Sequence, residues 1–411
     1  MENVFEILRE RGFIRQSTNP TEIARILSEE RITYYVGFDA TAESFHVGSL
    51  VPIMAMVHLQ RAGHTPIAII GGGTTMIGDP SGKTTMRQLL LRETIDANGD
   101  GLLSQLKRYL DFGEGIGTFL NNADWLLPLS YIDFLREIGR HFRVNEMIKA
   151  EAYRQRLERE EGLSFIEFNY QLLQAYDFLH LFRHHGCVLQ LGGDDQWGNI
   201  LAGVDLVRRL EGRTVHALTF PLLTTANGEK MGKTATGAVW LDTNRTSPYD
   251  FYQYWINVDD RDVKRFLACF TLLPMDEVNR LGELKGDSIR KAKEVLAYEV
   301  TKLAHGDVEA ENARSASRGA FGDGDIDLSA IPTTIVDADR LNGGIPVVDL
   351  FNEVGLGGSK SAVRRLIQQG GAYLNGEQIN DTNAILTGEH LDRGALLLRH
   401  GKKHVHRVVI E

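Results

Sequence analysis

The sequence predicts an α/β fold: a doubly wound parallel (Rossmann-like) sheet comes first, then a helical domain, then a small C-terminal α+β domain. Two strand-turn-helix patterns predict the sheet. Residues 32–38 lead through a polar turn into a helix over about 48–61, and residues 187–200 repeat the pattern. Residues 66–70 form the next strand after a helical crossover, so the strands should be parallel. The third observation is helical spacing of apolar residues over 247–320.

Composition limits the class of protein. The 411 residues are 43% hydrophobic and 24% charged, as in globular domains. Cys187 and Cys269 are the only cysteines, too few for a disulfide framework or a four-ligand zinc site, so we expect no zinc and a reduced, cytoplasmic location. The N-terminal residues are amphipathic and mixed in charge, which is unlike a signal peptide, and no apolar run suits a membrane span. The net charge of −10 means that nucleic acid would have to bind at local basic patches.

Residues 2–11 and 20–30 are predicted to form a helical hairpin packed outside the first domain. The first turn lies in the stretch 35–50, which joins the first strand to a helix. It places Asp39 and Thr41 before His46 and Gly48, at the start of a helix. Free N–H groups and the positive end of the helix dipole attract an anion there, and His46 could donate a hydrogen bond to it. A histidine that caps the helix or packs against it would fit the same pattern.

The second turn, residues 71–87, resembles a P-loop but lacks its spacing. Ile77 stands where that pattern requires a glycine, and only three residues separate Gly78 from Gly82. The glycine-rich loop with Lys83 and Arg87 could still contact phosphates or RNA. A flexible turn with solvated basic residues is the alternative.

Residues 102–161 are predicted to be mostly helical, and a helical insertion is expected around 120–185. Residues 143–162 should form one or two exposed helices with a basic side near Lys149, Arg154 and Arg156. Residues 165–182 form the next helix, on which Tyr170, Gln174 and Asp177 share one face. That face is either a pocket wall or a polar stripe on a helix surface.

Two later segments carry polar groups suited to a nucleotide. Residues 187–200 turn from a strand into a helix, the usual place for ribose and other polar ligand groups, and Arg208 and Arg209 follow. Lys230 and Lys233, in the loop 224–234, could close over a polyphosphate, although a solvated hairpin fits equally well.

Together these motifs resemble one family. His46-Val47-Gly48-Ser49 and Lys230-Met231-Gly232-Lys233-Thr234 resemble the two signatures of class I aminoacyl-tRNA synthetases. The blocks YVGFDATAESFHVGSL, GDPSGKTTMR, NYQLLQAYDFLHL and QLGGDDQWGN resemble the bacterial tyrosyl branch over nearly the whole length. Two departures stand out: Ser49 replaces the usual second histidine, and Gly232 and Thr234 replace serines.

The resemblance implies ATP-dependent activation of tyrosine, then its transfer to a tRNA, with Mg²⁺ accompanying ATP and no protein motif for the metal. Tyrosine-binding residues would be Tyr35, Asp79, Tyr170, Gln174, Asp177 and Gln196. ATP-binding residues would be Asp39, Gly48, Ser49, Gly192, Asp195 and Lys233. Electrostatic catalysts would be Thr41, His46, Lys83, Arg87, Lys230, Lys233 and Thr234. No side chain needs to act as a covalent nucleophile.

The resemblance also implies a domain order and a homodimer. Residues 1–246 would form the catalytic domain, 247–320 a helical anticodon-binding domain, 321–344 a linker and 345–411 an RNA-binding domain of the ribosomal small-subunit protein type. From 360 to 411 eight Lys or Arg face five acids, a net of +3 against the negative whole. The tRNA-binding candidates are Lys149, Arg208, Arg209, Lys360, Arg364, Arg365, Lys402, Lys403 and Arg407. A dimer interface could lie around 126–142.

Three alternatives differ in class. A tryptophanyl-tRNA synthetase would share the sheet and both signatures, but Asp177 facing Tyr35 favours a phenol over an indole. A nucleotidylyltransferase would not need the domains behind the sheet. A non-enzymatic RNA-binding scaffold would need neither His46 nor Lys233. The sequence leaves open the tRNA identity elements, the motion of the loop 224–234, the consequence of Ser49 and all affinities.

Overall fold

The computed structural model describes residues 3–81, 90–158, 162–234, 237–321, 331–392, 394–401 and 404–411, without the side chains of 152, 233, 234 and 319–321. The chain folds as two compact units. The first contains residues 1–231 and 268–270, and the second contains residues 232–267 and 271–411.

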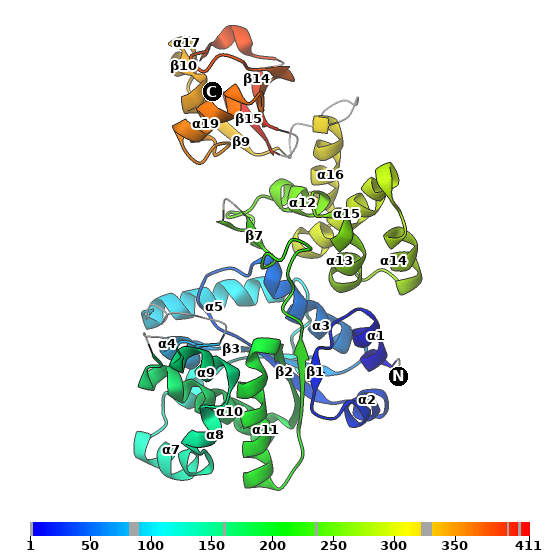
Figure 1. Ribbon diagram of the computed structural model, residues 1–411, viewed down its shortest axis with the longest axis vertical. Helices are drawn as coiled ribbons and strands as arrows, with labels where there is room; N and C mark the ends of the chain where they lie inside the picture. The colour runs from blue at the N-terminus through cyan, green and yellow to red at the C-terminus, as the bar shows by residue number, and fades with distance from the viewer. Residues whose placement is uncertain are drawn as a thin grey trace. The chain divides into compact units, whose positions relative to one another are not determined.

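The first unit is built on a six-stranded sheet with the order β1-β6-β5-β2-β3-β4 (Figure 1). Its strands are β1 (Gln16–Ser17), β2 (Thr33–Phe38), β3 (Thr65–Ile70), β4 (Thr118–Asn121), β5 (Cys187–Gly193) and β6 (His216–Phe220). All neighbours pair in parallel except β1, which is antiparallel to β6. The predicted parallel pairing of the first two long strands is confirmed, since Thr33 to Phe38 pair in register with Thr65 to Ile70.

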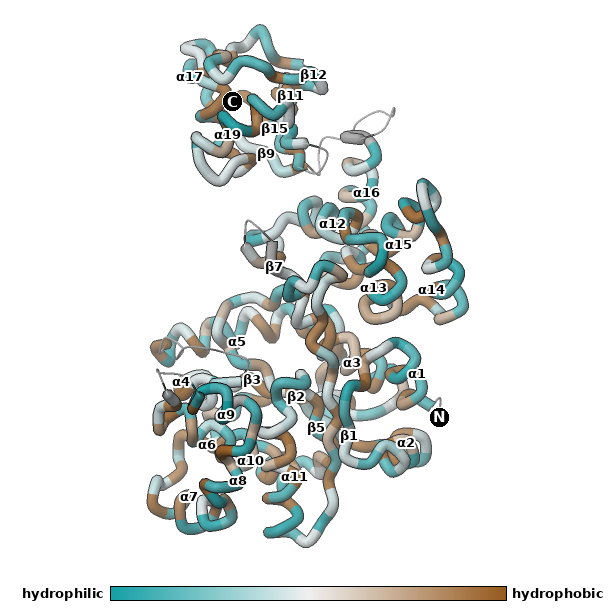
Figure 2. The backbone as a smooth tube through the Cα atoms, in the orientation of Figure 1, coloured by the Kyte–Doolittle hydropathy of each residue, from teal (hydrophilic) through white to brown (hydrophobic). Residues whose placement is uncertain are grey.

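Helices cover both faces of this sheet because alternate residues of a strand point to opposite sides. On β2, the Tyr34 hydroxyl donates a hydrogen bond to the Met56 carbonyl of α3 (Leu50–Arg61) at 2.7 Å. Its neighbour Tyr35 packs instead against Phe178 of α10 (Phe165–His185). In Figure 2 the strands carry the hydrophobic colour and the outer turns of the helices are more hydrophilic. The other helices at the N-terminus are α1 (Val4–Glu10) and α2 (Pro20–Glu29).

Helix α10 is fixed firmly at both ends. Ser164 and Glu167 form a capping box at its N-terminus, and Gly186, with φ of 61°, ends it in the left-handed conformation. Arg156 of α9 (Glu151–Leu157) forms a bidentate ion pair with Glu167 at 2.8 and 3.0 Å, and both side chains are buried. The prediction that Arg156 lies on an exposed basic face is therefore wrong, because a paired carboxylate compensates its burial.

Two predictions for residues 71–161 are also wrong. Residues 118–121, expected to be helical, form β4 beside β3, since a four-residue strand is too short to show a period of two. Part of the predicted glycine-rich loop is the short helix α4 (Gly72–Ile77). The other elements of the first unit between residues 92 and 211 are α5 (Arg92–Leu106), α6 (Ala123–Leu126), α7 (Tyr131–Glu137), η2 (Gly139–His141), α8 (Val144–Met147), η3 (Asp194–Gln196) and α11 (Trp197–Glu211).

The second unit begins with helices, as the apolar spacing predicts. They are α12 (Pro248–Ile256), α13 (Val263–Phe270), α14 (Met275–Gly282), α15 (Ile289–His305) and α16 (Asp307–Phe321), preceded by the short hairpin of β7 (Lys233–Thr234) and β8 (Gly237–Ala238). Trp255 and Phe251 of α12 are completely buried. Aromatic side chains at helical spacing therefore form core here.

The last part of the second unit is a five-stranded sheet with three helices. The strands are β9 (Thr333–Val336), β11 (Ala372–Leu374), β12 (Glu377–Gln378), β14 (Ala395–His400) and β15 (His404–Ile410), and the helices are α17 (Ala338–Asn342), α18 (Val347–Glu353) and α19 (Lys360–Gln368). A pair of two-residue strands, β10 (Ile345–Pro346) and β13 (Ile385–Leu386), lies apart from this sheet. Asn375 and Gly376 have positive φ in the predicted tight turn. Residues 333–342, predicted as linker, instead form β9 and α17, because β9 pairs with β15 far along the chain.

Candidate active site

The strand order places one edge of the first sheet where a ligand would bind. From β2 the chain adds β3 and β4 on one side and β5 and β6 on the other, so the order reverses between β2 and β5. Ligands of such sheets bind beyond the carboxyl ends of the strands at this point. Asp39 follows β2 there, and Asp195 and Gln196 follow β5.

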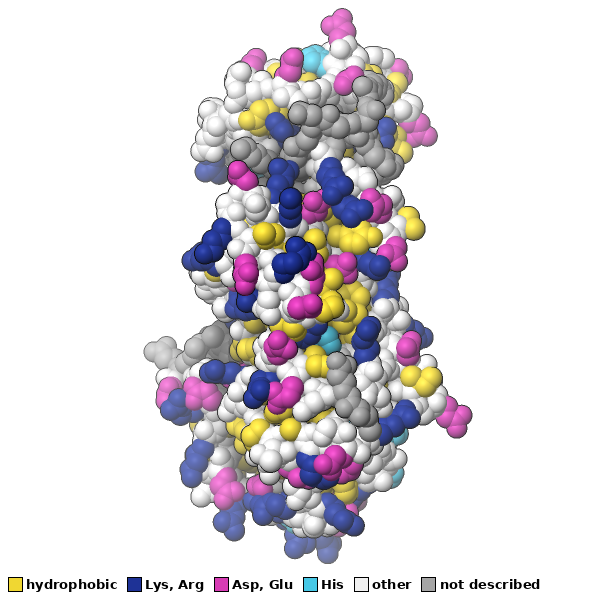
Figure 3. Space-filling view, turned by 90° about the vertical axis from the view of Figure 1, so that its right-hand side faces the viewer, with side chains coloured by type: hydrophobic (Ala, Val, Ile, Leu, Met, Phe, Trp, Pro, Cys, Tyr) yellow, Lys and Arg dark blue, Asp and Glu magenta, His cyan; other side chains and the backbone are white. Residues whose placement is uncertain are grey.

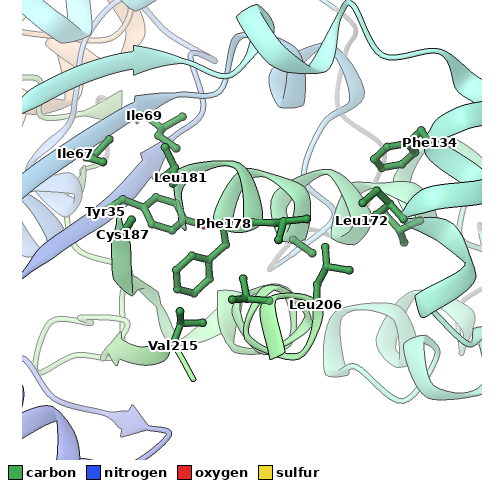
Figure 4. Packing of buried hydrophobic residues seen from close by; sticks show 14 of the residues in the cluster. Tyr35, Ile67, Ile69, Phe134, Leu172, Phe178, Leu181, Cys187, Leu206 and Val215 are labelled. Carbon is green, nitrogen blue, oxygen red and sulfur yellow. The ribbon is translucent and has the colours of Figure 1, made fainter. Parts of the chain in front are cut away.

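Tyr35 is a buried residue in the hydrophobic cluster around α10. It lies in the middle of β2 and is 2% exposed. Its ring meets Phe178 edge to face at 5.3 Å, among Ile67, Leu181 and Cys187 (Figure 4). Among the described residues the Tyr35 hydroxyl has no hydrogen-bond partner. Burial, with the nearby Asp177 charge, raises the pKa of Tyr35, so the phenol stays neutral.

Asp177 lies beside that hydroxyl and is held by two donors. The Asn122 amide donates to its Oδ2 at 2.9 Å, and the Trp125 indole N–H donates to its Oδ1 at 2.8 Å. Burial raises the pKa of Asp177 to about 7, although both hydrogen bonds oppose that rise. A buried carboxylate can accept a hydrogen bond from a ligand hydroxyl, and a buried phenol that has no described partner can donate one to the same hydroxyl.

The remaining candidates for binding the amino acid lie near Asp39 and Asp79. Tyr170 donates to Asp39 at 3.2 Å, and the buried Gln174 Oε1 has no described partner. Gln196 Nε2 donates to Asp79 Oδ2 at 2.7 Å. Burial, then the charge of Asp39, raises the pKa of Asp79 to about 6. The polar face of α10 is therefore largely buried and hydrogen-bonded, and it is not a solvated stripe.

A chain of hydrogen bonds joins Asp39 to Asp177. Thr74 donates to Asp39 Oδ1 at 3.1 Å and accepts from Asn122, which also donates to Asp177. Asn122 is 1% exposed, and its Oδ1 accepts the Gly73 N–H at 2.8 Å. Asp39, assigned to ATP by the resemblance, therefore contacts the amino-acid side. A Cβ on Gly71 would lie 2.4 Å from both Asp39 Oδ1 and Thr74 Oγ1, which is why glycine stands there.

Thr74, Asn122 and Trp125 were not predicted from the sequence as site residues. Asn122 follows β4 directly, so recognising that strand would have placed its side chain at the ligand edge. Trp125 lies one helical turn further along, in the four-residue helix α6. Nothing in its local spacing distinguishes it from a core tryptophan.

The turn after β2 is arranged differently, with Thr41 and His46 exposed. The Gly48 N–H donates to His46 Nδ1 at 3.0 Å, which leaves the ring proton on Nε2. A Cβ on Gly48 would lie 2.7 Å from the His46 ring and 3.4 Å from the Met231 carbonyl, so a larger residue would displace the ring, and Gly48 lies close to Met231 of the second signature. Ser49 is half-buried and makes no side-chain cap to α3.

The nucleotide candidates lie around the end of β5. Gly192 is in β5, and Asp195 follows in η3. Burial raises the pKa of Asp195, and the exposed Lys230 opposes that shift, so the two side chains are close enough to interact. Lys83 and Arg87 lie outside the described residues. Lys233 and Thr234 form β7, and their side chains are not described.

Most described tRNA candidates are exposed. Lys149, Arg364 and Arg365 are open to solvent, while Arg208 pairs with Asp205 at 2.8 Å and Lys360 with Asp349 at 2.9 Å. Arg209 donates to the His141 carbonyl, and Arg407 is half-buried in β15. Lys402 and Lys403 lie outside the described residues. On the face shown in Figure 3, basic and acidic side chains are interspersed.

Two kinds of feature are absent from the described residues. No cluster of three or more His, Cys, Asp or Glu side chains in those ranges could hold a metal ion. Within the same ranges, none of the helices combines the length and apolar character needed to cross a bilayer.

Comparisons with known proteins follow the same division of the chain. Residues 27–322 match the family model of class I tRNA synthetases (W and Y), and residues 327–408 match that of the tyrosine–tRNA ligase SYY-like C-terminal domain. A tyrosine–tRNA ligase of Desulfosudis oleivorans is 54% identical over 99% of both chains, and one of Clostridium botulinum is 53% identical over 100% of both.

A solved structure agrees with these sequence matches. The C-terminally truncated mitochondrial tyrosyl-tRNA synthetase of Aspergillus nidulans superposes with a TM-score of 0.71 at 32% identity, over 78% of this chain and 95% of that one. The predicted fold class is thereby confirmed. The chain belongs to the class I aminoacyl-tRNA synthetases, in the tyrosine–tRNA ligase family.

Proposed function

We propose that this chain is a tyrosine–tRNA ligase whose amino-acid pocket is closed at its floor by Tyr35 and Asp177. One observation supports this most strongly: a buried phenol without a described partner lies beside a buried carboxylate. Such a pair leaves one donor and one acceptor for a substrate hydroxyl. A tryptophan-binding site is the rival, but an indole could not both donate and accept in its ring plane.

The mouth of the pocket would hold the α-ammonium group of tyrosine. Asp79, Tyr170 and Gln174 take this role, and Asp39, through Tyr170, adds negative charge. Gln196 would lie near the reacting carboxylate. Its amide donates to Asp79 at 2.7 Å, which joins the residue near the carboxylate to the one that would hold the ammonium.

Activation is an in-line displacement. The tyrosine carboxylate attacks the α-phosphorus of ATP, a new carboxyl–phosphate bond forms, and pyrophosphate leaves with the electron pair of the broken bond. Thr41, His46 and the lysines of the loop, with Thr234, would donate to the departing phosphates. Lys83 and Arg87 would assist from the second turn. These contacts accelerate the reaction to the extent that they strengthen in the transition state.

The nucleoside would lie along the turn after β5. Gly192 and Asp195 would contact the ribose, and Gly48 would allow close approach of the nucleotide beside Ser49. Mg²⁺ would accompany ATP and neutralise phosphate charge. No chelating cluster of side chains among the described residues dictates its ligands.

Selection against phenylalanine would come from the floor of the pocket. Without a substrate hydroxyl, Tyr35 and Asp177 would both lose a partner in a dry site. Tyrosyl-tRNA synthetases are themselves the usual example of this kind of discrimination.

The second unit would bind the tRNA. We assign anticodon recognition to the helices within 247–320 and RNA-backbone contacts to the C-terminal module, which begins by residue 333 and not at 345. Helix α19 begins at Lys360 and also carries Arg364 and Arg365. Contacts of such side chains with RNA phosphates weaken as the salt concentration rises. Reversing all three charges should raise the KM for tRNA and leave pyrophosphate exchange unchanged.

A homodimer and a cytoplasmic location complete the proposal. Exposed apolar side chains gather on the segment of α6 to α8: Leu127, Tyr131, Ile132, Leu135, Val144 and Ile148. A second copy covering them would remove this apolar surface from water. Cys187 and Cys269 are buried thiols, which suit a reducing compartment.

ATP–pyrophosphate exchange with each of the twenty amino acids tests the function. The proposal predicts exchange with tyrosine alone above background. Exchange driven by tryptophan, or by no amino acid, would overturn it.

A further inference from the structure

The indole ring of Trp125 contacts α10 both through its edge and through its face. Its indole N–H donates to Asp177 Oδ1 at 2.8 Å. Its ring plane stacks on the imidazole of His180, with 4.4 Å between centroids and 11° between planes. Asp177 and His180 are three residues apart on α10, so they project from one face of the helix.

The stack controls the direction of the indole N–H. That bond lies in the ring plane, and a hydrogen bond weakens steeply when donor and acceptor are misaligned. Trp125 is only half-buried in a four-residue helix, so the surrounding core does not enclose its ring. A parallel ring against one face removes the rotation that would turn the N–H away from Asp177.

We propose that His180 is a positioning residue for amino-acid specificity: its ring holds the Trp125 indole, and the indole N–H then fixes Asp177 toward the substrate phenol. The proposal rests on the role of Asp177 under the proposed function. His180 itself touches no substrate in this arrangement.

The ring of His180, and not a charge on it, performs this role. Its neighbours on α10 are Tyr176, whose ring centroid is 6.4 Å away, Arg183, His184 and His185. Trp125 is the group that faces it from α6. Burial, followed by the charges of His184, His185 and Arg183, lowers the pKa of His180 to about 4. A neutral imidazole therefore stacks at neutral pH, and another aromatic ring should replace it.

Three single variants of the full-length chain separate these effects. H180L removes the ring, H180F keeps a ring without nitrogen atoms, and H185L changes an exposed histidine of the same helix that does not stack on Trp125. Tyrosine-dependent and phenylalanine-dependent pyrophosphate exchange is measured for each. Circular dichroism and thermal melting check the fold, and H180Q replaces H180L if the latter does not fold.

We expect H180L to raise the KM for tyrosine about tenfold with kcat within about twofold, and to lower the tyrosine-to-phenylalanine ratio of kcat/KM about tenfold. H180F and H185L should match the wild type within about twofold. The acidic limb of the pH profile should move to higher pH in H180L, because a weakened indole bond no longer lowers the pKa of Asp177.

Two results would overturn the inference. One is a folded ringless variant with wild-type tyrosine KM and selectivity, and the other is an H180F variant as defective as H180L. Failure of the proposed function is a separate outcome, since the wild type itself would then show no tyrosine-dependent exchange.

Discussion

The two halves of the proposed active site are built in opposite ways. On the amino-acid half, Tyr35, Asp79 and Asp177 are buried, and described donors hold both carboxylates. On the phosphate half, Thr41, His46 and Lys230 are exposed. The amino-acid half is a buried, hydrogen-bonded group of side chains, and the phosphate half is an open turn at a helix start.

The difference follows from what each half would do. Discrimination between tyrosine and phenylalanine depends on polar groups that lose their partners in a dry site, and this requires burial and a fixed geometry. The phosphates of ATP arrive hydrated and highly charged, and their donors matter most when charge moves to the leaving group. Exposure of those donors costs little in the ground state.

Asp177→Ala should have the largest effect. It removes the charged acceptor beside Tyr35 and takes away the acceptor of the Trp125 indole N–H and of one Asn122 amide N–H, so kcat/KM for tyrosine in pyrophosphate exchange should fall about 10³-fold. Asp96→Ala, which removes an exposed carboxylate of α5, is the control. Wild-type exchange in the Asp177 variant would remove the amino-acid half from the account.

His46→Ala tests the open half and should come next. We expect kcat for exchange to fall about 10²-fold while the KM for tyrosine stays within about twofold, because the donor acts mainly in the transition state. His46→Asn, which retains an N–H donor, should recover part of the rate. A variant that loses tyrosine affinity instead would contradict the separation of the two halves.

Acidification should weaken tyrosine binding about tenfold between pH 8 and pH 6. Burial raises the pKa of Asp177 to about 7, so the carboxylate is mostly ionised at pH 8 and mostly neutral at pH 6, where it loses charge-assisted hydrogen bonding. Since the folded pKa lies above the unfolded value, this group's contribution to stability changes in the opposite sense and increases as pH falls from about 7 to about 4. The kcat/KM for tyrosine and the thermal midpoint are measured over one pH series. A flat profile of kcat/KM would show that Asp177 does not titrate in this range.

Ser49→His should have the smallest effect. Ser49 is half-buried at the start of α3 without a side-chain cap, so a histidine would add one donor to the nucleotide side and disturb little else. We expect the KM for ATP to change less than about threefold and the KM for tyrosine to stay constant. A tenfold change in the KM for tyrosine would mean that the first signature reaches the amino-acid half.

Local sequence patterns were enough to predict the parallel strands β2 and β3, the polar face of α10 and the tight turn at Asn375. These features repeat at short period or require particular turn residues. They did not reveal β4 or β9, because both are four-residue strands whose pairing partners lie far away in the sequence.

The same distinction applies within the site. Asp177 and Tyr170 could be selected from helical spacing and resemblance, whereas Asn122 and Trp125 matter only because α6 packs beside α10. The local sequence around Arg156 predicts a solvated cation, and only the folded structure shows that it pairs with Glu167, eleven residues away. Partners of buried polar groups are properties of packing, and local patterns do not contain them.

Calorimetric binding of L-tyrosine and L-phenylalanine to the full-length chain at pH 8, without ATP, tests the central claim most directly. If the amino-acid half is complete before the nucleotide arrives, tyrosine will bind and phenylalanine will bind at least about 10²-fold more weakly. Equal affinities, or tyrosine binding that requires ATP, would contradict a pocket that selects its substrate through Tyr35 and Asp177.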